Sequence, residues 1–211
     1  MTFPDAQRAY PITLPDGSEH TGTVFLSQVI DHPGWEVGAY TYASDFDPPE
    51  DWASRLAPYL FGGPERLRIG RFCQIAHGVR FVTSGANHAT DGLTTFPFPV
   101  FDPAQISSYQ PDRRDTVVGH DVWLGYGAIV CPGAQIGNGV MVGAGAVVRG
   151  RVPDYAVVTG NPAQVVRMRF DAETVAQLIG IAWWDWPADA VAAAVPALLS
   201  GDVDALAALA P

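Results

Sequence analysis

The sequence contains no lysine and few charged residues of either sign. Its 12 basic residues are all Arg, against 22 acidic residues, so the formal net charge is −10. Charged residues make up 16% of the chain, compared with about 25% in typical globular proteins. Binding to nucleic acid depends on neutralising phosphates with a basic surface, so this acidic composition argues against a general nucleic-acid-binding protein.

Cysteines and long apolar runs are also scarce. The two cysteines, Cys73 and Cys131, can form at most one disulfide and do not have the spacing of a zinc site. No window of about 18 residues is continuously apolar, so we expect no transmembrane helix. Residues 1–12 contain no basic stretch followed by an apolar run, so we expect no signal peptide. The sequence predicts a cytoplasmic protein with no membrane or nucleic-acid partner.

Glycine, proline and hydrophobic residues are abundant. With 22 Gly and 18 Pro among 211 residues, these two types reach about 19% of the chain, against about 12% on average. Hydrophobic residues make up 48%, which is ample apolar surface to offset the chain entropy lost on folding. The composition predicts one folded domain, or one with a small appendage, that contains many turns.

An aliphatic residue recurs every six positions between residues 118 and 152. A small or branched residue follows each one four positions later. A period of six fits neither a helix nor an alternating strand, but it fits a triangular parallel β-helix in which each hexad forms one short strand and a turn. Three hexads complete one coil, and coils stack at the strand spacing of about 4.8 Å. The aliphatic positions are Val118, Leu124, Val130, Ile136, Val142 and Val148, and the small or branched ones are Val122, Ala128, Ala134, Val140, Ala146 and Val152.

The same register occurs earlier in the chain. Further hexads begin at Ile69, Ile75 and Phe81, and a weaker match begins at Val37. Free cysteine is often buried as a small apolar residue, so Cys73 is predicted to lie in the interior. The small positions of these earlier hexads are Thr41, Cys73 and Val79.

The repeat is interrupted by a long insertion at residues 84–116. A long loop on a rigid scaffold is usually functional or disordered, and the Pro and aromatic residues of this one predict an ordered loop. The chain is therefore predicted to comprise an N-terminal segment (1–34), a β-helix (35–165) that carries the inserted loop, and a C-terminal helical cap (166–211).

The C-terminal part has clear helix signals. Asp171 can cap a helix, Pro187 can open a second, and residues 202–210 can form a short third. Three Trp residues within 183–186 predict a packing plug. We expect the helices to close the open end of the solenoid, where strand edges would otherwise be unpaired. The apolar face of the first helix is predicted to consist of Val175, Leu178, Ile179 and Ala182.

Several motifs in combination resemble one family. They are IGRFC at 69–73, GANH at 85–88, DG at 91–92, TFPF at 95–98, GHDVWLG at 119–125, GNPA at 160–163 and WWDWP at 183–187. Together they resemble the xenobiotic acetyltransferases, hexapeptide-repeat acyltransferases that include streptogramin A and type B chloramphenicol acetyltransferases. The resemblance covers roughly residues 35–190.

This resemblance implies both a fold and an assembly. The fold is an all-β solenoid: a left-handed parallel β-helix of hexapeptide repeats with a long inserted loop and C-terminal α-helices. The assembly is a homotrimer whose active site lies between neighbouring subunits. General crossover rules favour a right-handed connection, so the left-handed expectation comes from the resemblance alone.

His88 matches the catalytic base of that family. Acetyl transfer to an alcohol requires removal of the hydroxyl proton while the oxygen attacks the thioester carbonyl. A neutral imidazole can accept that proton. The acceptor alcohol is itself the nucleophile, so no acyl-enzyme is needed once both substrates are bound. The resemblance thus implies an O-acetyltransferase that uses acetyl-CoA, with a small-molecule alcohol as its acceptor and with no metal.

Six positions match residues that line the cofactor groove of the family: Trp123, Tyr126, Ala144, Arg149, Gly150 and Arg167. The chain has no Gly-rich phosphate loop, so the diphosphate must meet Arg side chains and backbone amides. Members often carry Lys where Gly150 stands, which puts one phosphate contact in question. Four Arg residues that are close in the sequence predict a local basic patch: Arg149, Arg151, Arg167 and Arg169.

The acceptor site is predicted from two segments. Tyr40 and Tyr42 resemble the family segment that lines the acceptor pocket, and Asn87, Phe96 and Phe98 on the inserted loop are further candidate substrate-binding residues. An apolar pocket with few polar groups suits a drug-like or lipid-like alcohol better than a free sugar. The fold does not identify that alcohol, which could be chloramphenicol, streptogramin A or an endogenous hydroxyl compound.

Two other interpretations stay open: a non-catalytic β-helix that binds or scaffolds, and an acetyltransferase for an endogenous sugar or lipid hydroxyl. His77 and His120 are expected to be solvent-facing turn residues, because each lies two positions after an interior aliphatic residue. Carbonic anhydrases that share this solenoid bind zinc through histidines at a spacing that no two histidines show here, so a metal is not expected.

Overall fold

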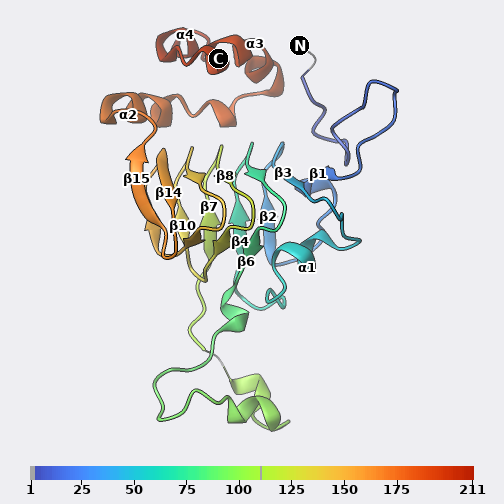
Figure 1. Ribbon diagram of the computed structural model, residues 1–211, viewed down its shortest axis with the longest axis vertical. Helices are drawn as coiled ribbons and strands as arrows, with labels where there is room; N and C mark the ends of the chain where they lie inside the picture. The colour runs from blue at the N-terminus through green and yellow to red at the C-terminus, as the bar shows by residue number, and fades with distance from the viewer. Residues whose placement is uncertain (1–2, 110) are drawn as a thin grey trace.

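The computed structural model describes residues 3–109 and 111–211. Within these residues, the hexapeptide repeat forms a solenoid of stacked coils with three sheet faces (Figure 1). Successive hexads place their short strands in different sheets, and each strand pairs in parallel with the equivalent strand of the next coil. The predicted parallel sheets of a hexapeptide solenoid are confirmed.

The three sheets are built as follows. The seven-stranded sheet has the order β1 (Thr23–Phe25), β3 (Tyr42–Ser44), β5 (Gln74–Ile75), β8 (Trp123–Leu124), β11 (Met141–Val142), β14 (Ala156–Thr159) and β15 (Gln164–Met168). The five-stranded sheet has the order β13 (Arg151–Val152), β10 (Gln135–Ile136), β7 (Thr116–Val118), β4 (Leu67–Ile69) and β2 (Trp35–Val37). The three-stranded sheet has the order β12 (Val147–Val148), β9 (Ile129–Val130) and β6 (Arg80–Phe81).

The interior of the solenoid is filled by the predicted repeat positions. All six aliphatic and all six small positions between residues 118 and 152 are buried, with at most 6% of any of them exposed. The strand register places aliphatic residues of successive coils on top of one another, so that Leu124 lies between Ile75 and Val142 in adjacent strands. Cys73 is buried among them, as predicted.

The first coil begins at the weak match in the sequence. Strand β2 pairs with β4, and Thr41 takes the small interior position of its hexad. Strand β1 pairs antiparallel with β3 and forms one edge of the seven-stranded sheet. The sequence did not predict β1, the short helix α1 (Trp52–Leu56) or the antiparallel pair formed by β14 and β15, because none of these follows the repeat.

One corner of the solenoid is built from residues with left-handed backbone conformation. Tyr40, Phe72 and Asp121 each lie two positions before a strand of the seven-stranded sheet, and Tyr155 lies directly before one. The φ angles of all four lie between 53° and 64°. L side chains adopt this conformation rarely and at an energetic cost. At the next corner, the equivalent positions are glycines at 78, 127 and 145, which carry no such cost. We call the four residues the αL corner.

The C-terminal helices pack along the αL corner. The Trp183 ring lies 4.9 Å from that of Phe72, and the Trp184 ring stacks on His120 at 5.3 Å. Figure 1 shows α2 (Ala172–Ile181), α3 (Ala188–Ser200) and α4 (Val203–Ala207) along one side of the solenoid. The prediction that they close its open end is wrong, because the aromatic corner provides the apolar surface that they bury.

Several helix details are confirmed. The Asp171 side chain caps α2 by accepting from the Thr174 N–H group, and Asp202 caps α4 in the same way. All three Trp residues of the plug are buried. The predicted apolar face of α2 is partly wrong: Leu178 is buried, but Ile179 is exposed, and Ala182 lies beyond the helix as its left-handed C-cap.

The inserted loop projects from the opposite side of the solenoid (Figure 1). It joins β6 to β7, and its described residues include the 3₁₀ helices Ser84–Ala86, Phe98–Phe101 and Ile106–Ser108. Other 3₁₀ helices are formed by Leu26–Gln28 and Trp183–Asp185. In the described part of the chain, no helix has the length and apolar character needed to cross a membrane.

Candidate active site

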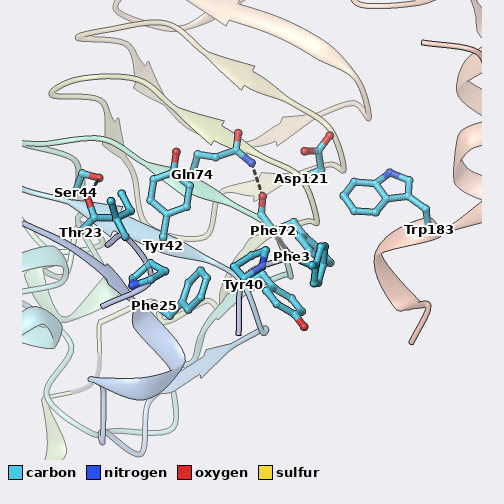
Figure 2. A pocket seen from close by; sticks show the side chains of 13 residues that line it. Phe3, Thr23, Phe25, Tyr40, Tyr42, Ser44, Phe72, Gln74, Asp121 and Trp183 are labelled. Carbon is cyan, nitrogen blue, oxygen red and sulfur yellow. Dashed lines mark hydrogen bonds between the residues drawn. The ribbon is translucent and has the colours of Figure 1, made fainter. Parts of the chain in front are cut away.

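A cavity lies where the N-terminal segment meets the first coils. It has a volume of about 580 Å³ and is lined by Phe3, Pro4, Pro11, Ile12, Thr23, Phe25, Tyr40, Tyr42, Ser44, Phe72, Gln74, Asp121 and Trp183. We call it the tyrosine cavity, because it contains both tyrosines predicted to bind the acceptor. Figure 2 shows its walls to be mainly aromatic, with Thr23, Ser44, Gln74 and Asp121 as the labelled polar side chains.

The αL corner explains how the two tyrosines are placed. Tyr40 is itself an αL residue, and its ring stacks on Phe72 at 4.7 Å and meets Phe25 edge-on at 5.9 Å. Tyr42 lies on β3, where burial raises the pKa of its hydroxyl and so keeps it a neutral hydrogen-bond donor. Gln74 is oriented by its donation to the Phe72 carbonyl (Figure 2).

Asp121 brings a carboxylate to the same cavity. Its Oδ2 atom lies 3.4 Å from Nη1 of Arg169. Burial raises the pKa of Asp121, and the nearby Arg169 opposes that shift. The sequence prediction did not include Asp121, since only the fold brings it beside Arg169 and Trp183.

A second hollow adjoins the first on the same sheet. It has a volume of about 310 Å³ and is lined by Tyr42, Ser44, Phe46, Gln74, Ile75, Ala76, His77, Trp123 and Tyr126. We call it the aromatic slot. Two predicted cofactor residues lie here, with 46% of Trp123 and 59% of Tyr126 exposed. The slot shares Tyr42, Ser44 and Gln74 with the tyrosine cavity, so predicted acceptor and cofactor residues occupy one continuous surface.

The expectation that His77 and His120 face solvent is wrong for both. His77 lines the aromatic slot, and its Nδ1 atom lies 2.6 Å from Oδ1 of Asp45. His120 accepts the Arg71 N–H group at Nδ1, at 2.9 Å, and burial lowers its pKa. Both histidines lie at turns as expected, but side chains from other coils and from the C-terminal helices cover those turns.

His88 lies on the inserted loop with its imidazole exposed. Its Nδ1 atom lies 2.9 Å from the Thr95 carbonyl oxygen. A carbonyl can only accept, so in the neutral ring Nδ1 carries the proton and Nε2 keeps its lone pair. This is the arrangement that a general base requires, because Nε2 can take a proton from a substrate hydroxyl.

The loop around His88 is held by its own contacts. The Asn87 side chain donates to the Asp112 carbonyl at 3.0 Å, and the Tyr109 hydroxyl accepts the Ala89 N–H group at 2.8 Å. The Phe96 ring packs against Phe98 at 4.6 Å and against a third loop aromatic, Phe101, at 5.3 Å, yet all three side chains are largely exposed.

Within one chain, these loop residues do not meet the tyrosine cavity. Among the described residues, none from the inserted loop lines either the cavity or the aromatic slot. His88, Asn87, Phe96 and Phe98 are therefore separated from Tyr40 and Tyr42, and a single chain does not bring the predicted residues into one site.

The four Arg residues of the predicted basic patch lie on different faces of the solenoid. Arg149 follows β12 of the three-stranded sheet, Arg151 lies on β13 of the five-stranded sheet, and Arg167 lies on β15 of the seven-stranded sheet. Arg169 contacts Asp121 of the αL corner and donates to the Gly139 carbonyl at 2.7 Å. A compact patch of four in one chain was therefore a wrong prediction, because the coil turns a short sequence distance into different faces.

The remaining predicted cofactor positions lie at turns. Ala144 and Gly150 are exposed, and Gly150 has φ of 68°, which suits glycine. Ala144 is stacked in the coil next to Tyr126, whose carbonyl accepts the Gly145 N–H group at 2.8 Å. This turn thus continues the surface that begins in the aromatic slot.

Comparisons with known proteins identify the family of this chain. The family model "Bacterial transferase hexapeptide (six repeats)" matches residues 115–150. A chloramphenicol acetyltransferase from Agrobacterium fabrum is 40% identical over 87% of this chain and 90% of its own length. The chain belongs to the xenobiotic acetyltransferases. Another chloramphenicol acetyltransferase, from Escherichia coli, is 36% identical over 86% of this chain and 90% of its own. A virginiamycin A acetyltransferase from Staphylococcus aureus is 30% identical over 96% and 92%.

In this xenobiotic acetyltransferase, the residues predicted for acetyl transfer lie in separate places. Tyr40 and Tyr42 line the cavity on the seven-stranded sheet, and His88 lies on the projecting loop. Across residues 3–109 and 111–211, no three or more His, Cys, Asp or Glu side chains are grouped so as to hold a metal ion.

Proposed function

We propose that this protein transfers the acetyl group of acetyl-CoA to a hydroxyl group of a small, largely apolar, antibiotic-like alcohol, with His88 as general base. The observation that carries the proposal is the contact of His88 Nδ1 with the Thr95 carbonyl, which leaves Nε2 as a proton acceptor. Nε2 takes the hydroxyl proton as the alcohol oxygen attacks the thioester carbonyl. The imidazolium then returns that proton to the departing thiolate, so the histidine is regenerated.

The tyrosine cavity supports an apolar acceptor. Its volume of about 580 Å³ lies within the range of roughly 300–1,000 Å³ that is usual for drug-sized ligands. Aromatic rings form most of its walls, and a few polar groups such as Thr23, Tyr42 and Gln74 can orient a ligand. The relatives described above are named as acetyltransferases of chloramphenicol and of virginiamycin A, which supports an antibiotic as the acceptor.

We further propose that the active protein is a homotrimer of left-handed β-helices in which His88 reaches the cavity of a neighbouring subunit. Two features support this assembly. No described residue of the loop that carries His88 lines either hollow of its own chain, and Phe96, Phe98 and Phe101 on this loop are largely exposed. Closed cyclic symmetry lets each of three identical loops cover one neighbouring cavity and bury those rings. The exposed Arg149 and Arg167 are the proposed partners for the phosphates of acetyl-CoA.

The proposal is tested by following thiol release from acetyl-CoA in the presence of chloramphenicol or streptogramin A. His88→Ala is expected to lower turnover about 10²–10⁴-fold, the usual contribution of a positioned general base. The variant is expected to fold normally, because His88 lies outside the repeat. His20→Ala is the matched control, since His20 is exposed and lines neither hollow. Full activity of His88→Ala rules out the proposed mechanism.

A further inference from the structure

One residue of the aromatic slot, His77, contacts a buried aspartate, and the mechanism does not use this pair. Nδ1 of His77 lies 2.6 Å from Oδ1 of Asp45. The imidazole is flanked by two aromatic rings, Phe46 at 4.8 Å and Tyr126 at 5.5 Å. The partners come from different coils, since Asp45 follows β3, His77 follows β5 and Tyr126 follows β8. The fold therefore assembles this pair, with His77 lining the slot and Asp45 buried against its Nδ1 atom.

Asp45 is itself held firmly. Its side chain is almost fully buried, and Oδ1 also accepts the Asp47 N–H group at 2.9 Å. Its Oδ2 atom lies 4.0 Å from Nε of Arg55. The Asp45 N–H group donates to the Gly22 carbonyl at 2.9 Å, which anchors the backbone at this position. A carboxylate in this setting provides a fixed acceptor for an imidazole.

The contact with Asp45 determines which nitrogen of His77 carries the proton. A carboxylate accepts, so Nδ1 donates to it, and the neutral ring keeps its lone pair on Nε2. The Phe46 N–H group lies 3.2 Å from the same Nδ1 atom, but a nitrogen that donates cannot also accept, and the shorter contact with the charged oxygen prevails. His77 thus offers Nε2 to the slot as a hydrogen-bond acceptor.

The chemistry of the slot restricts what it binds. No Arg is among the residues that line it within the described ranges, so it is not built for a phosphate or a carboxylate. Aromatic walls and one nitrogen acceptor suit a slender, neutral chain that carries N–H donors. The slot also opens into the tyrosine cavity through Tyr42, Ser44 and Gln74. A chain bound in the slot therefore delivers its end to the acceptor.

We propose that His77 binds the pantetheine arm of acetyl-CoA by accepting a hydrogen bond at Nε2 from one of its amide N–H groups. Asp45 is the positioning residue that holds the required tautomer. The inference rests on the proposed acetyl transfer, because it uses acetyl-CoA as the donor. It adds a substrate contact that neither the repeat nor the motifs of the sequence predicted.

Two substitutions separate this role from a structural one. His77→Asn places an amide near the position of Nδ1, so it keeps the donation to Asp45 but has no acceptor near Nε2. His77→Gln places an amide oxygen near the position of Nε2, so it keeps an acceptor but loses the contact with Asp45. A structural role predicts that Asn is tolerated better than Gln, and the proposed role predicts the reverse.

The experiment measures steady-state kinetics with acetyl-CoA and chloramphenicol, together with calorimetric binding of coenzyme A alone. For His77→Asn we expect the Michaelis constant for acetyl-CoA, and the dissociation constant of coenzyme A, to rise about three- to tenfold, as for the loss of one hydrogen bond. His77→Gln is expected to stay within about twofold of the wild type in both. Turnover and the Michaelis constant for chloramphenicol should change little in either variant.

The outcomes also separate this inference from the proposed function. If the wild type transfers no acetyl group but binds coenzyme A with the expected order of the variants, the proposed function fails and the His77 contact stands. Equal affinities for coenzyme A in all three proteins overturn the His77 assignment, whatever the turnover. So does a change confined to the Michaelis constant for chloramphenicol, which would place the acceptor in the slot instead.

Discussion

Thr41 joins the first two coils through its buried hydroxyl group. Oγ1 donates to the Gly70 carbonyl at 2.6 Å and accepts the Cys73 N–H group at 3.0 Å, and the residue is 0% exposed. Thr41→Val keeps the shape of the side chain but leaves both backbone groups without the partner that the structure gives them. Each unpaired buried group costs about 1–3 kcal/mol, so the expected loss in unfolding free energy is about 2–6 kcal/mol.

Thr41→Ser is the matched control, because it keeps the hydroxyl and removes one buried methyl group, at a cost of about 1 kcal/mol. Urea unfolding at one fixed protein concentration measures both variants against the wild type. We expect the serine variant to be clearly the more stable, although valine is the more apolar residue in a buried position. If the valine variant is as stable as the serine variant, the two hydrogen bonds do not hold the coils together.

Three further predictions concern titration, reactivity and assembly. Burial lowers the pKa of His120 in the folded state; the nearby Arg71 adds to this shift and Asp185 opposes it. The neutral ring therefore contributes fully to the free energy of unfolding above the unfolded pKa of about 6.5, and this contribution is lost as the pH falls below that value. His120→Asn can still accept the Arg71 N–H group but does not titrate, so its melting temperature should fall less than that of the wild type between about pH 7 and pH 5. If both melting temperatures fall equally, the lowered pKa of His120 is contradicted. Burial raises the pKa of Cys73 to about 12, so mass spectrometry should find a thiol reagent on half-buried Cys131 before Cys73, which should react only after unfolding. Sedimentation velocity should show a trimer at concentrations where acetyl transfer is measured, and an active monomer of 22.5 kDa would refute the shared site.

The solenoid itself was predictable from the sequence, because its signal is local and repeated. Each hexad needs only one aliphatic residue and one small or branched residue at set positions, and these side chains fill the interior of the coil. This is why positions from Val118 to Val152 were assigned correctly, and why Thr41 and Cys73 were assigned to the interior as well. The helix caps were local signals too, because each capping contact spans three residues. Asp171 was predicted as a cap, and Asp202 lies at the start of the helix predicted for residues 202–210.

The site depended on features that no local pattern contains. His77 meets Asp45, and Asp121 meets Arg169, only because coils stack with one register while the loops between them differ in length. The same stacking separates the four Arg residues that are close in the sequence. The stacking of coils also creates the αL corner with its aromatic surface. The C-terminal helices bury that surface, so they lie along the side of the solenoid instead of at its end. The sequence by itself therefore determined which residues fill the coil, and the tertiary structure alone decided which outward side chains meet, because that depends on which coils and loops come together at each corner.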